Sequence, residues 1–89
     1  MVWKIEFGPA AIKELRKLDS QTARRIIAFL RLRVAKLDDP RAIGQALSGE
    51  KLGDYWKYRV GDWRITAKIE DKKQLILVLR VGNRRDVYK

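Results

Sequence analysis

The chain has 89 residues, and its 21 Lys and Arg against 11 Asp and Glu give a formal net charge of +10, which indicates an anionic partner such as nucleic acid, an acidic protein or a membrane surface. A chain of this length can bury one modest core, so we expect a single domain over residues 1–89. The absence of Cys and His excludes disulfides, thiolate and imidazole metal ligands, and catalysis by either side chain.

The N-terminal half predicts one strand followed by two amphipathic helices. Val2–Phe7 alternates apolar and polar residues as a strand does, and Pro9 suits the first position of a helix. Apolar residues at helical spacing extend this helix over 9–18, and Ser20 is a suitable N-cap for the second. The second helix ends before Asp38-Asp39-Pro40 and has a clear apolar stripe, formed by Ala23, Ile27, Leu30, Val34 and Leu37.

The C-terminal half predicts three strands. Residues 40–53 are rich in Gly and are expected to form a long loop that can hold one helical turn at Ala42–Leu47. Strands at Asp54–Val60 and Trp63–Ile69 flank Gly61-Asp62, which fits a type II′ turn. After a turn at Glu70–Lys73, Leu75–Val81 is apolar on both faces, like a central strand. The order predicts an α+β fold with two N-terminal helices on one face of a mainly antiparallel four-stranded sheet.

A two-residue turn at Gly61-Asp62 would set the register of the hairpin and divide its side chains between two faces. One face is apolar and should pack on the helices: Trp56, Tyr58, Val60, Trp63, Ile65, Ala67 and Ile69. The opposite face is polar and cationic: Tyr55, Lys57, Arg59, Arg64, Thr66 and Lys68. The register therefore favours core packing over base stacking for both tryptophans.

The cationic face has two interpretations. Arg59 would lie opposite Arg64, and like charges in that position cost stability, which a bound polyanion such as a phosphate would offset. Alternatively the face is simply solvated, because Lys and Arg are common on the open side of a sheet. A solvated face is also the simpler interpretation of the arginines on the second helix: Arg24, Arg25, Arg31 and Arg33.

No segment of the sequence predicts a membrane helix. The longest apolar runs are Ile26–Leu30 and Leu75–Leu79, far short of the roughly 20 residues that a membrane span needs. The N-terminus alternates apolar and charged residues and lacks the apolar core of a signal peptide. We therefore expect a soluble, cytoplasmic protein with no membrane partner.

Three segments resemble the RelE/ParE toxin superfamily over nearly the whole chain. They are the helix Lys13–Leu18, the hairpin Trp56–Ile65 and the C-terminal run Arg80–Tyr88. The resemblance implies a compact, microbial-ribonuclease-like fold with a curved sheet, and the toxin half of a type II toxin–antitoxin system. RelE-type members cleave messenger RNA without metal, typically in the ribosomal A site, and a cognate antitoxin holds them inactive. ParE-type members share the fold, poison DNA gyrase and lack the nuclease residues.

The resemblance also implies which residues act. RelE-type nuclease positions are matched by Lys57, Arg59, Arg64, Arg84 and Tyr88, which favours an endoribonuclease, or mRNA interferase, without cofactor or metal. Further candidates for RNA binding are Lys51, Tyr55, Lys68 and Arg85. Two positions depart from the family: Arg59 stands where some members have Lys, and Asn83 stands where many have His. The implied partners are messenger RNA, the ribosome and an acidic or amphipathic antitoxin, the latter with a DNA-binding half.

RNA supplies its own nucleophile, so the expected reaction is attack of a 2′-hydroxyl on the adjacent phosphate, giving 2′,3′-cyclic phosphate and 5′-hydroxyl ends. Without His, the base must be a Lys, a Tyr or a carboxylate, and Lys57 is our choice. Arg59 and Arg64 would hold the non-bridging oxygens, and Arg84 would clamp the phosphate or help the leaving oxygen. Tyr88 would stack on a base or bind the 2′-hydroxyl. The alternatives are a ParE-like gyrase poison and a plain basic nucleic-acid-binding module.

Overall fold

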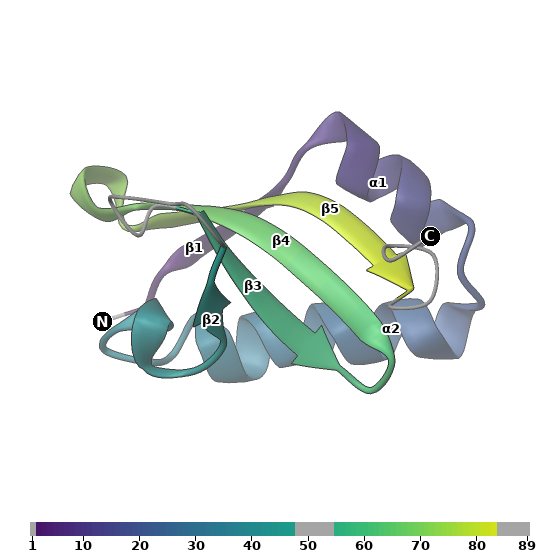
Figure 1. Ribbon diagram of the computed structural model, residues 1–89, viewed down its shortest axis with the longest axis horizontal. Helices are drawn as coiled ribbons and strands as arrows, with labels where there is room; N and C mark the ends of the chain where they lie inside the picture. Colours follow the sequence, from purple (N-terminus) through teal and green to yellow (C-terminus); the bar gives the residue numbers. More distant parts are fainter. Residues whose placement is uncertain (1, 48–54, 84–89) are drawn as a thin grey trace.

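The computed structural model describes residues 2–47 and 55–83. Within these ranges, five strands form one sheet in the order β1-β5-β4-β3-β2, with α1 beside β5 and α2 running behind the sheet (Figure 1). The strands are β1 (Lys4–Phe7), β2 (Gln45–Ala46), β3 (Tyr55–Val60), β4 (Trp63–Glu70) and β5 (Leu75–Asn83). The helices are α1 (Pro9–Arg16), α2 (Ser20–Ala28), the π-helix η1 (Phe29–Val34) and the 3-10 turns η2 (Pro40–Ala42) and η3 (Asp71–Lys73).

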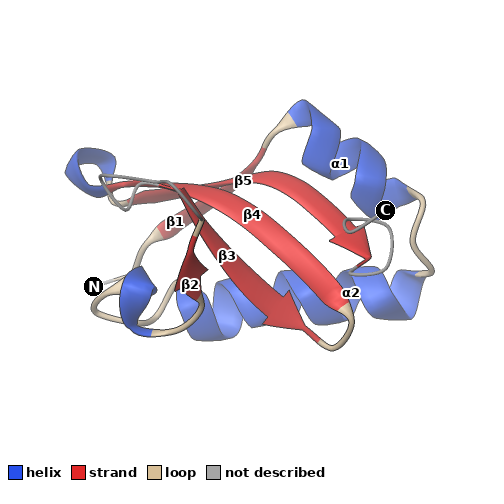
Figure 2. Ribbon diagram, in the orientation of Figure 1, coloured by secondary structure: helices blue, strands red, loops and turns tan. Residues whose placement is uncertain are grey.

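The predicted α+β class is confirmed, but the sheet has one strand more than predicted (Figure 2). The additional strand is β2, which pairs with β3 through Gln45 and Ala46 inside the segment expected to be a loop. Both residues are exposed, so no apolar alternation marks them in the sequence. The helical turn expected at Ala42–Leu47 lies earlier, at Pro40–Ala42. β1 is parallel to β5, whereas the other neighbouring strands are antiparallel.

The helices begin and end at slightly different residues from those predicted. The N-cap of α2 is Asp19 rather than Ser20: its carboxylate accepts hydrogen bonds from Thr22 N–H at 3.0 Å and Thr22 Oγ1 at 2.6 Å. An anionic acceptor is favoured here because it also complements the positive end of the helix dipole. Beyond Ala28 the helix widens into η1, and its last turn places Ala35 N–H 2.9 Å from Leu30 O. In the described ranges, no helix is long and apolar enough to cross a bilayer.

The hairpin register is as predicted, with Val60 opposite Trp63 and Arg59 opposite Arg64. Gly61 has φ +60° and Asp62 does not have a positive φ, as a type II′ turn requires. The apolar face of the hairpin packs on both helices, with Trp56 and Trp63 half-buried at its margin. The fully buried side chains of this core include Ile26 and Leu30 from the second helix and Tyr58, Ile65, Ile69, Ile76 and Val78 from the sheet.

A β-bulge in β5 changes which side chains face the core. Ala67 pairs with Val78, but Thr66 pairs with Arg80, so Leu79 is an additional residue in β5. Beyond Leu75, which is also buried, the buried residues of β5 are Ile76, Val78 and Val81, with a step of three in place of a second step of two. Without the bulge, Arg80 would lie opposite Ile65 and face the core. The bulge therefore turns Arg80 to the outer face of the sheet.

Tyr58 is a buried core residue whose hydroxyl is hydrogen-bonded. Its ring is 1% exposed and lies edge-on to Phe29, with ring centroids 6.1 Å apart. Its hydroxyl donates a hydrogen bond to Pro40 O at 2.6 Å, and burial raises the pKa of the phenol. The bond ties β3 to the turn at Pro40–Ala42 that leads into β2.

We predict that Tyr58→Phe lowers the free energy of unfolding by about 1–3 kcal/mol, because it leaves the Pro40 carbonyl without its buried donor. Urea denaturation followed by circular dichroism measures the change. Tyr55→Phe is the matched control, since Tyr55 lies on the outer face of the same strand, and its effect should stay within about 0.5 kcal/mol. Equal losses from both variants would show that the Tyr58 hydroxyl bond does not contribute.

Candidate nucleic-acid interface

Basic side chains from three neighbouring strands meet on the outer face of the sheet. One row across the strands is Arg59–Arg64–Gly82, and the next is Lys57–Thr66–Arg80. Neighbouring strands lie about 4.8 Å apart, so each row spans roughly 10 Å between its outer Cα atoms. The predicted juxtaposition of Lys57, Arg59 and Arg64 is thus present in the fold. We call the four basic residues Lys57, Arg59, Arg64 and Arg80 the cationic face.

The other predicted site residues divide into two groups. Tyr55 and Lys68 lie directly opposite each other in the next row, and the Lys68 ammonium is 6.0 Å from the Tyr55 ring centroid. That distance is at the limit of a cation–π contact. Four predicted residues lie outside the described ranges: Lys51, Arg84, Arg85 and Tyr88.

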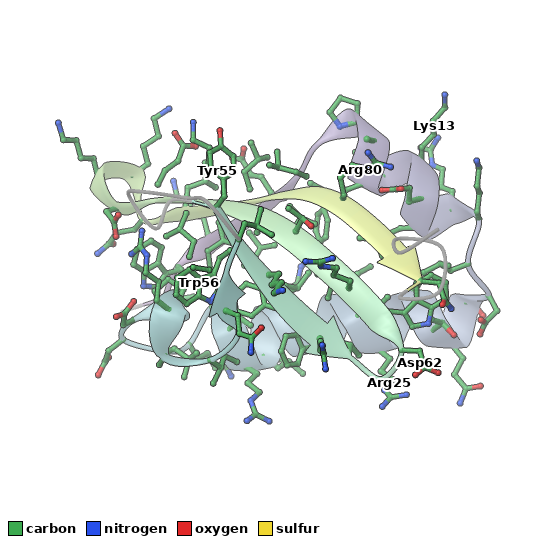
Figure 3. All side chains as sticks on the ribbon, in the orientation of Figure 1. Lys13, Arg25, Tyr55, Trp56, Asp62 and Arg80 are labelled. Carbon is green, nitrogen blue, oxygen red and sulfur yellow. The ribbon has the colours of Figure 1, made fainter. Side chains whose placement is uncertain are left out.

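Arg80 was missed as a site residue in the sequence, because an unbroken alternation along β5 would have placed it in the core. Its guanidinium instead lies beside α1, as Figure 3 shows, and bonds Glu14 side-on. Nε is 3.2 and 3.3 Å from the two carboxylate oxygens, and Nη2 is 3.0 Å from Oε2. The step of three between the buried residues Val78 and Val81 marks the bulge in the structure, but the continuous apolar run at 75–79 hides it in the sequence.

Glu14 also binds the backbone of β5. Its Oε1 accepts a hydrogen bond from Val81 N–H at 2.8 Å, beyond the point where β1 stops pairing with β5 at Val78. Burial by itself would raise the pKa of the Glu14 carboxyl, but the bonds from Arg80 and Val81 and the charges of Arg80 and Lys17 outweigh it and lower that pKa. Glu14 is therefore an anionic acceptor at neutral pH.

Two cavities lie against the cationic face. One of about 360 Å³ is lined by Glu14, Leu47, Arg64, Thr66, Arg80 and Gly82. The other, of about 390 Å³, lies between η1 and the start of β2, and is lined by Phe29, Arg33, Ile43, Gly44, Gln45, Lys57, Tyr58 and Arg59. Arg33, assigned from the sequence to a solvated helix face, thus shares a cavity with Lys57 and Arg59.

This arrangement suits a polyanion. Forked guanidinium donors match the oxygens of a phosphate, and Lys supplies a compact charge beside them. Direct opposition of Arg59 and Arg64 costs stability in the free protein, and an anion between them removes that cost. The cavities next to the rows leave room for the sugars and bases of a nucleic-acid strand.

Comparisons with known proteins agree on one family. Residues 5–88 match the family described as the ParE toxin of type II toxin–antitoxin systems, parDE. Toxin RelG of Mycobacterium tuberculosis is 26% identical over 89 residues, covering 100% of this chain and 99% of that protein. A free E. coli toxin RelE with two arginine-to-alanine substitutions superimposes with a TM-score of 0.77 at 27% identity, covering 99% of this chain and 92% of that chain.

The toxin–antitoxin complex RelBE2 of Mycobacterium tuberculosis contains a chain with the same fold. It superimposes with a TM-score of 0.81 at 23% identity, covering 94% of this chain and 93% of that chain. At this identity the likeness shows the shared fold. The fold expected from the sequence is therefore confirmed against solved structures as well as by the topology of the sheet.

The Glu14 contacts predict how stability depends on pH. A carboxylate with a lowered pKa stabilises the folded state above its unfolded pKa, and this contribution is lost as pH falls through the folded pKa. The free energy of unfolding should therefore fall as the pH drops below the ordinary Glu pKa of 4.5, and Glu14→Gln should reduce that fall. Urea denaturation at a series of pH values measures it.

Within the described part of the chain, Asp19 and Asp71 should add to this pH dependence, because their pKa values are also lowered, chiefly by hydrogen bonds from Thr22 and from Arg41 respectively. Arg80→Gln should reduce the fall only in part, because the bond from Val81 remains. An unchanged pH profile in Glu14→Gln would contradict the assignment.

Proposed function

The chain belongs to the RelE/ParE superfamily of type II toxin–antitoxin toxins, and because its hairpin carries the residues of RelE-type members we propose that it acts as an mRNA interferase, an endoribonuclease that needs no metal. We further propose that it cleaves messenger RNA in the ribosomal A site. The observation that supports this is the placement of Lys57 beside Arg59 and Arg64 on one open face of the sheet. A proton acceptor and forked phosphate donors on neighbouring positions of two paired strands are what cleavage by an internal 2′-hydroxyl requires.

In the proposed reaction, the 2′-oxygen attacks the adjacent phosphorus while Lys57 accepts the hydroxyl proton. Arg59 and Arg64 bind the non-bridging oxygens, whose charge grows in the transition state, and each forked donor is worth most there. The bond from phosphorus to the 5′-oxygen breaks, and that oxygen takes up a proton, which leaves a 2′,3′-cyclic phosphate and a 5′-hydroxyl. Arg84 and Tyr88 have the roles implied by the family: Arg84 at the phosphate or leaving oxygen, Tyr88 at a base or the 2′-hydroxyl.

The ribosome would supply orientation that the small domain cannot. Arg59 and Arg80 of the cationic face are exposed and Lys57 and Arg64 are half-buried, and the arginines can hold a phosphate without fixing the in-line geometry of attack. A messenger held in the A site presents an ordered phosphate, and such positioning is worth several kcal/mol of the barrier. We expect cleavage of free RNA to be slow for the same reason.

A cognate antitoxin is the proposed protein partner. Toxins of similar structure from E. coli and Pyrococcus horikoshii are found in RelB–RelE complexes. The net charge of +10 favours a partner segment that is acidic or amphipathic. Such a segment would inhibit directly by covering the cationic face or by displacing the C-terminal run that carries Arg84 and Tyr88.

The second candidate function is that of a gyrase poison without nuclease activity. It is favoured by the name of the matched family, ParE, although the similar proteins reported above are RelE and RelG. The nucleic-acid products in the cell distinguish the nuclease from the gyrase poison. Induced cells would contain RNA with new 5′-hydroxyl ends in the first case, and broken DNA with trapped gyrase in the second.

We predict that Lys57→Ala and Lys57→Arg both abolish cleavage and growth arrest. Ala removes the proton acceptor, and Arg keeps the charge but does not readily give up its own proton. Single-turnover cleavage on programmed ribosomes measures this, with thermal melts to show that the fold is intact.

Lys13→Ala is the matched control, because it removes one positive charge from an exposed position on α1 that points away from the sheet (Figure 3). It should cleave at the rate of the unaltered chain. Near-normal cleavage by Lys57→Arg would contradict the base assignment. Full toxicity of Lys57→Ala, with broken DNA, would support the gyrase poison instead.

A further inference from the structure

The C-terminal part of β5 places a basic residue on the outer face of the sheet, on the side of β4 opposite to β3. The bulge at Leu79 pairs Arg80 with Thr66, in the row that begins with Lys57. Arg80 is diagonal to Arg64, because Arg64 pairs with Gly82 two residues further along β5. Diagonal neighbours lie about 7–8 Å apart, which long side chains can bridge. Arg80 thus places a cation on β5, beyond the β3–β4 hairpin, in the same row as Lys57.

Glu14 restrains the direction in which this guanidinium points. The side-on contact uses the Nε and Nη2 edge of Arg80. A guanidinium has five N–H donors, so the contact leaves Nη1 directed away from the carboxylate. The Arg80 side chain is 67% exposed despite the pair, whereas that of Glu14 is 24% exposed and is fixed by its second bond to Val81 N–H. The anchored member of the pair is therefore Glu14, and the accessible member is Arg80.

We propose that Arg80 forms an anion-binding subsite for a backbone phosphate of the RNA strand, and that Glu14 is the positioning residue that orients its guanidinium. This rests on the proposed function for the identity of the anion. The phosphate is a neighbour of the cleaved one, since the subsite lies across β4 from Lys57. The cavity lined by Arg64, Thr66, Arg80 and Gly82 holds the nucleotide between the two phosphates.

A purely structural role accounts poorly for the pair. An ion pair with one member two-thirds exposed contributes little to stability, because water and salt screen it. The structural task at this edge is to satisfy Val81 N–H, and Glu14 does so with its Oε1. Arg80 adds a third arginine to the face on which Arg59 lies directly opposite Arg64. Binding of an RNA phosphate by Arg80 accounts for this additional charge.

The test is the salt dependence of binding to an RNA oligonucleotide with 2′-O-methyl groups throughout, which cannot be cleaved. For single strands, each neutralised phosphate contributes roughly 0.7 to the slope of log affinity against log salt. Arg80→Ala should lower the slope by about that amount and weaken binding roughly tenfold at low salt. Lys13→Ala, which removes the same charge from the outer side of α1, should leave the slope unchanged.

A double variant distinguishes the loss of a phosphate contact at Arg80 from repulsion of the RNA by Glu14. Arg80→Ala exposes the Glu14 carboxylate, which could itself repel RNA, whereas Arg80→Ala with Glu14→Gln restores the net charge of the unaltered chain. The proposal expects the double variant to bind as weakly as Arg80→Ala. Recovery of the original affinity would overturn the phosphate contact and leave only repulsion by Glu14.

Glu14→Gln alone tests the positioning role. This substitution removes a negative charge. If the Glu14 carboxylate merely repelled RNA, the variant would bind RNA more tightly. The proposal expects binding several-fold weaker, with the loss absent in the Arg80→Ala background. Tighter binding by Glu14→Gln would overturn the positioning role.

The outcomes distinguish this subsite from the proposed nuclease function. Normal ribosomal cleavage by the unaltered chain, with equal slopes for Arg80→Ala and Lys13→Ala, would overturn the subsite alone. Absence of cleavage, with the slope reduced only by Arg80→Ala, would overturn the nuclease and retain the subsite. Failure of the unaltered chain to bind the oligonucleotide at low salt would overturn the subsite.

Discussion

The two-residue turn at Gly61-Asp62 sets the register of β3 against β4, and both faces of the sheet depend on that register. Because side chains alternate, a slip of β3 by one residue would turn Lys57 and Arg59 toward the core and expose Tyr58. The same pairing that closes the core therefore places Arg59 opposite Arg64 on the outer face. Burial of Tyr58 and Ile65 on the other face fixes the positions of the two arginines, and a fixed pair of cations is pre-organised for an anion.

A second constraint acts at the far side of the sheet. β1 is short and stops pairing with β5 at Val78, and Glu14 of α1 takes over at Val81 by accepting its N–H. The bulge at Leu79 lies between these two points and turns Arg80 outward. The end of β1, the bulge and Glu14 thus depend on one another. Without Glu14, Val81 N–H would lose its acceptor and the Arg80 guanidinium would lose its partner. Without the bulge, Arg80 would face the core.

The opposite edge is shaped by a close backbone approach. Gly44 has φ +83°, and a Cβ at this position would lie 2.4 Å from the carbonyl oxygen of Lys57. Only glycine permits this conformation and this contact without displacing β3. The approach brings the start of β2 against the strand that carries Lys57 and Arg59, and it forms one wall of the cavity that Arg33 also lines. Backbone geometry at this edge therefore bears directly on the cationic face.

Local patterns in the sequence determined the α+β class, the hairpin register and the meeting of Lys57, Arg59 and Arg64, because strand alternation and a two-residue turn are short-range properties. Tertiary structure alone decided the rest. The strand β2 has two exposed residues and forms only because β3 is there to pair with it. The direction of Arg80 depends on a bulge, and the partner of its guanidinium is 66 residues away in the chain. Neither a bulge nor a contact at that separation leaves a periodic signal, because each depends on how elements dock and not on the residues beside it.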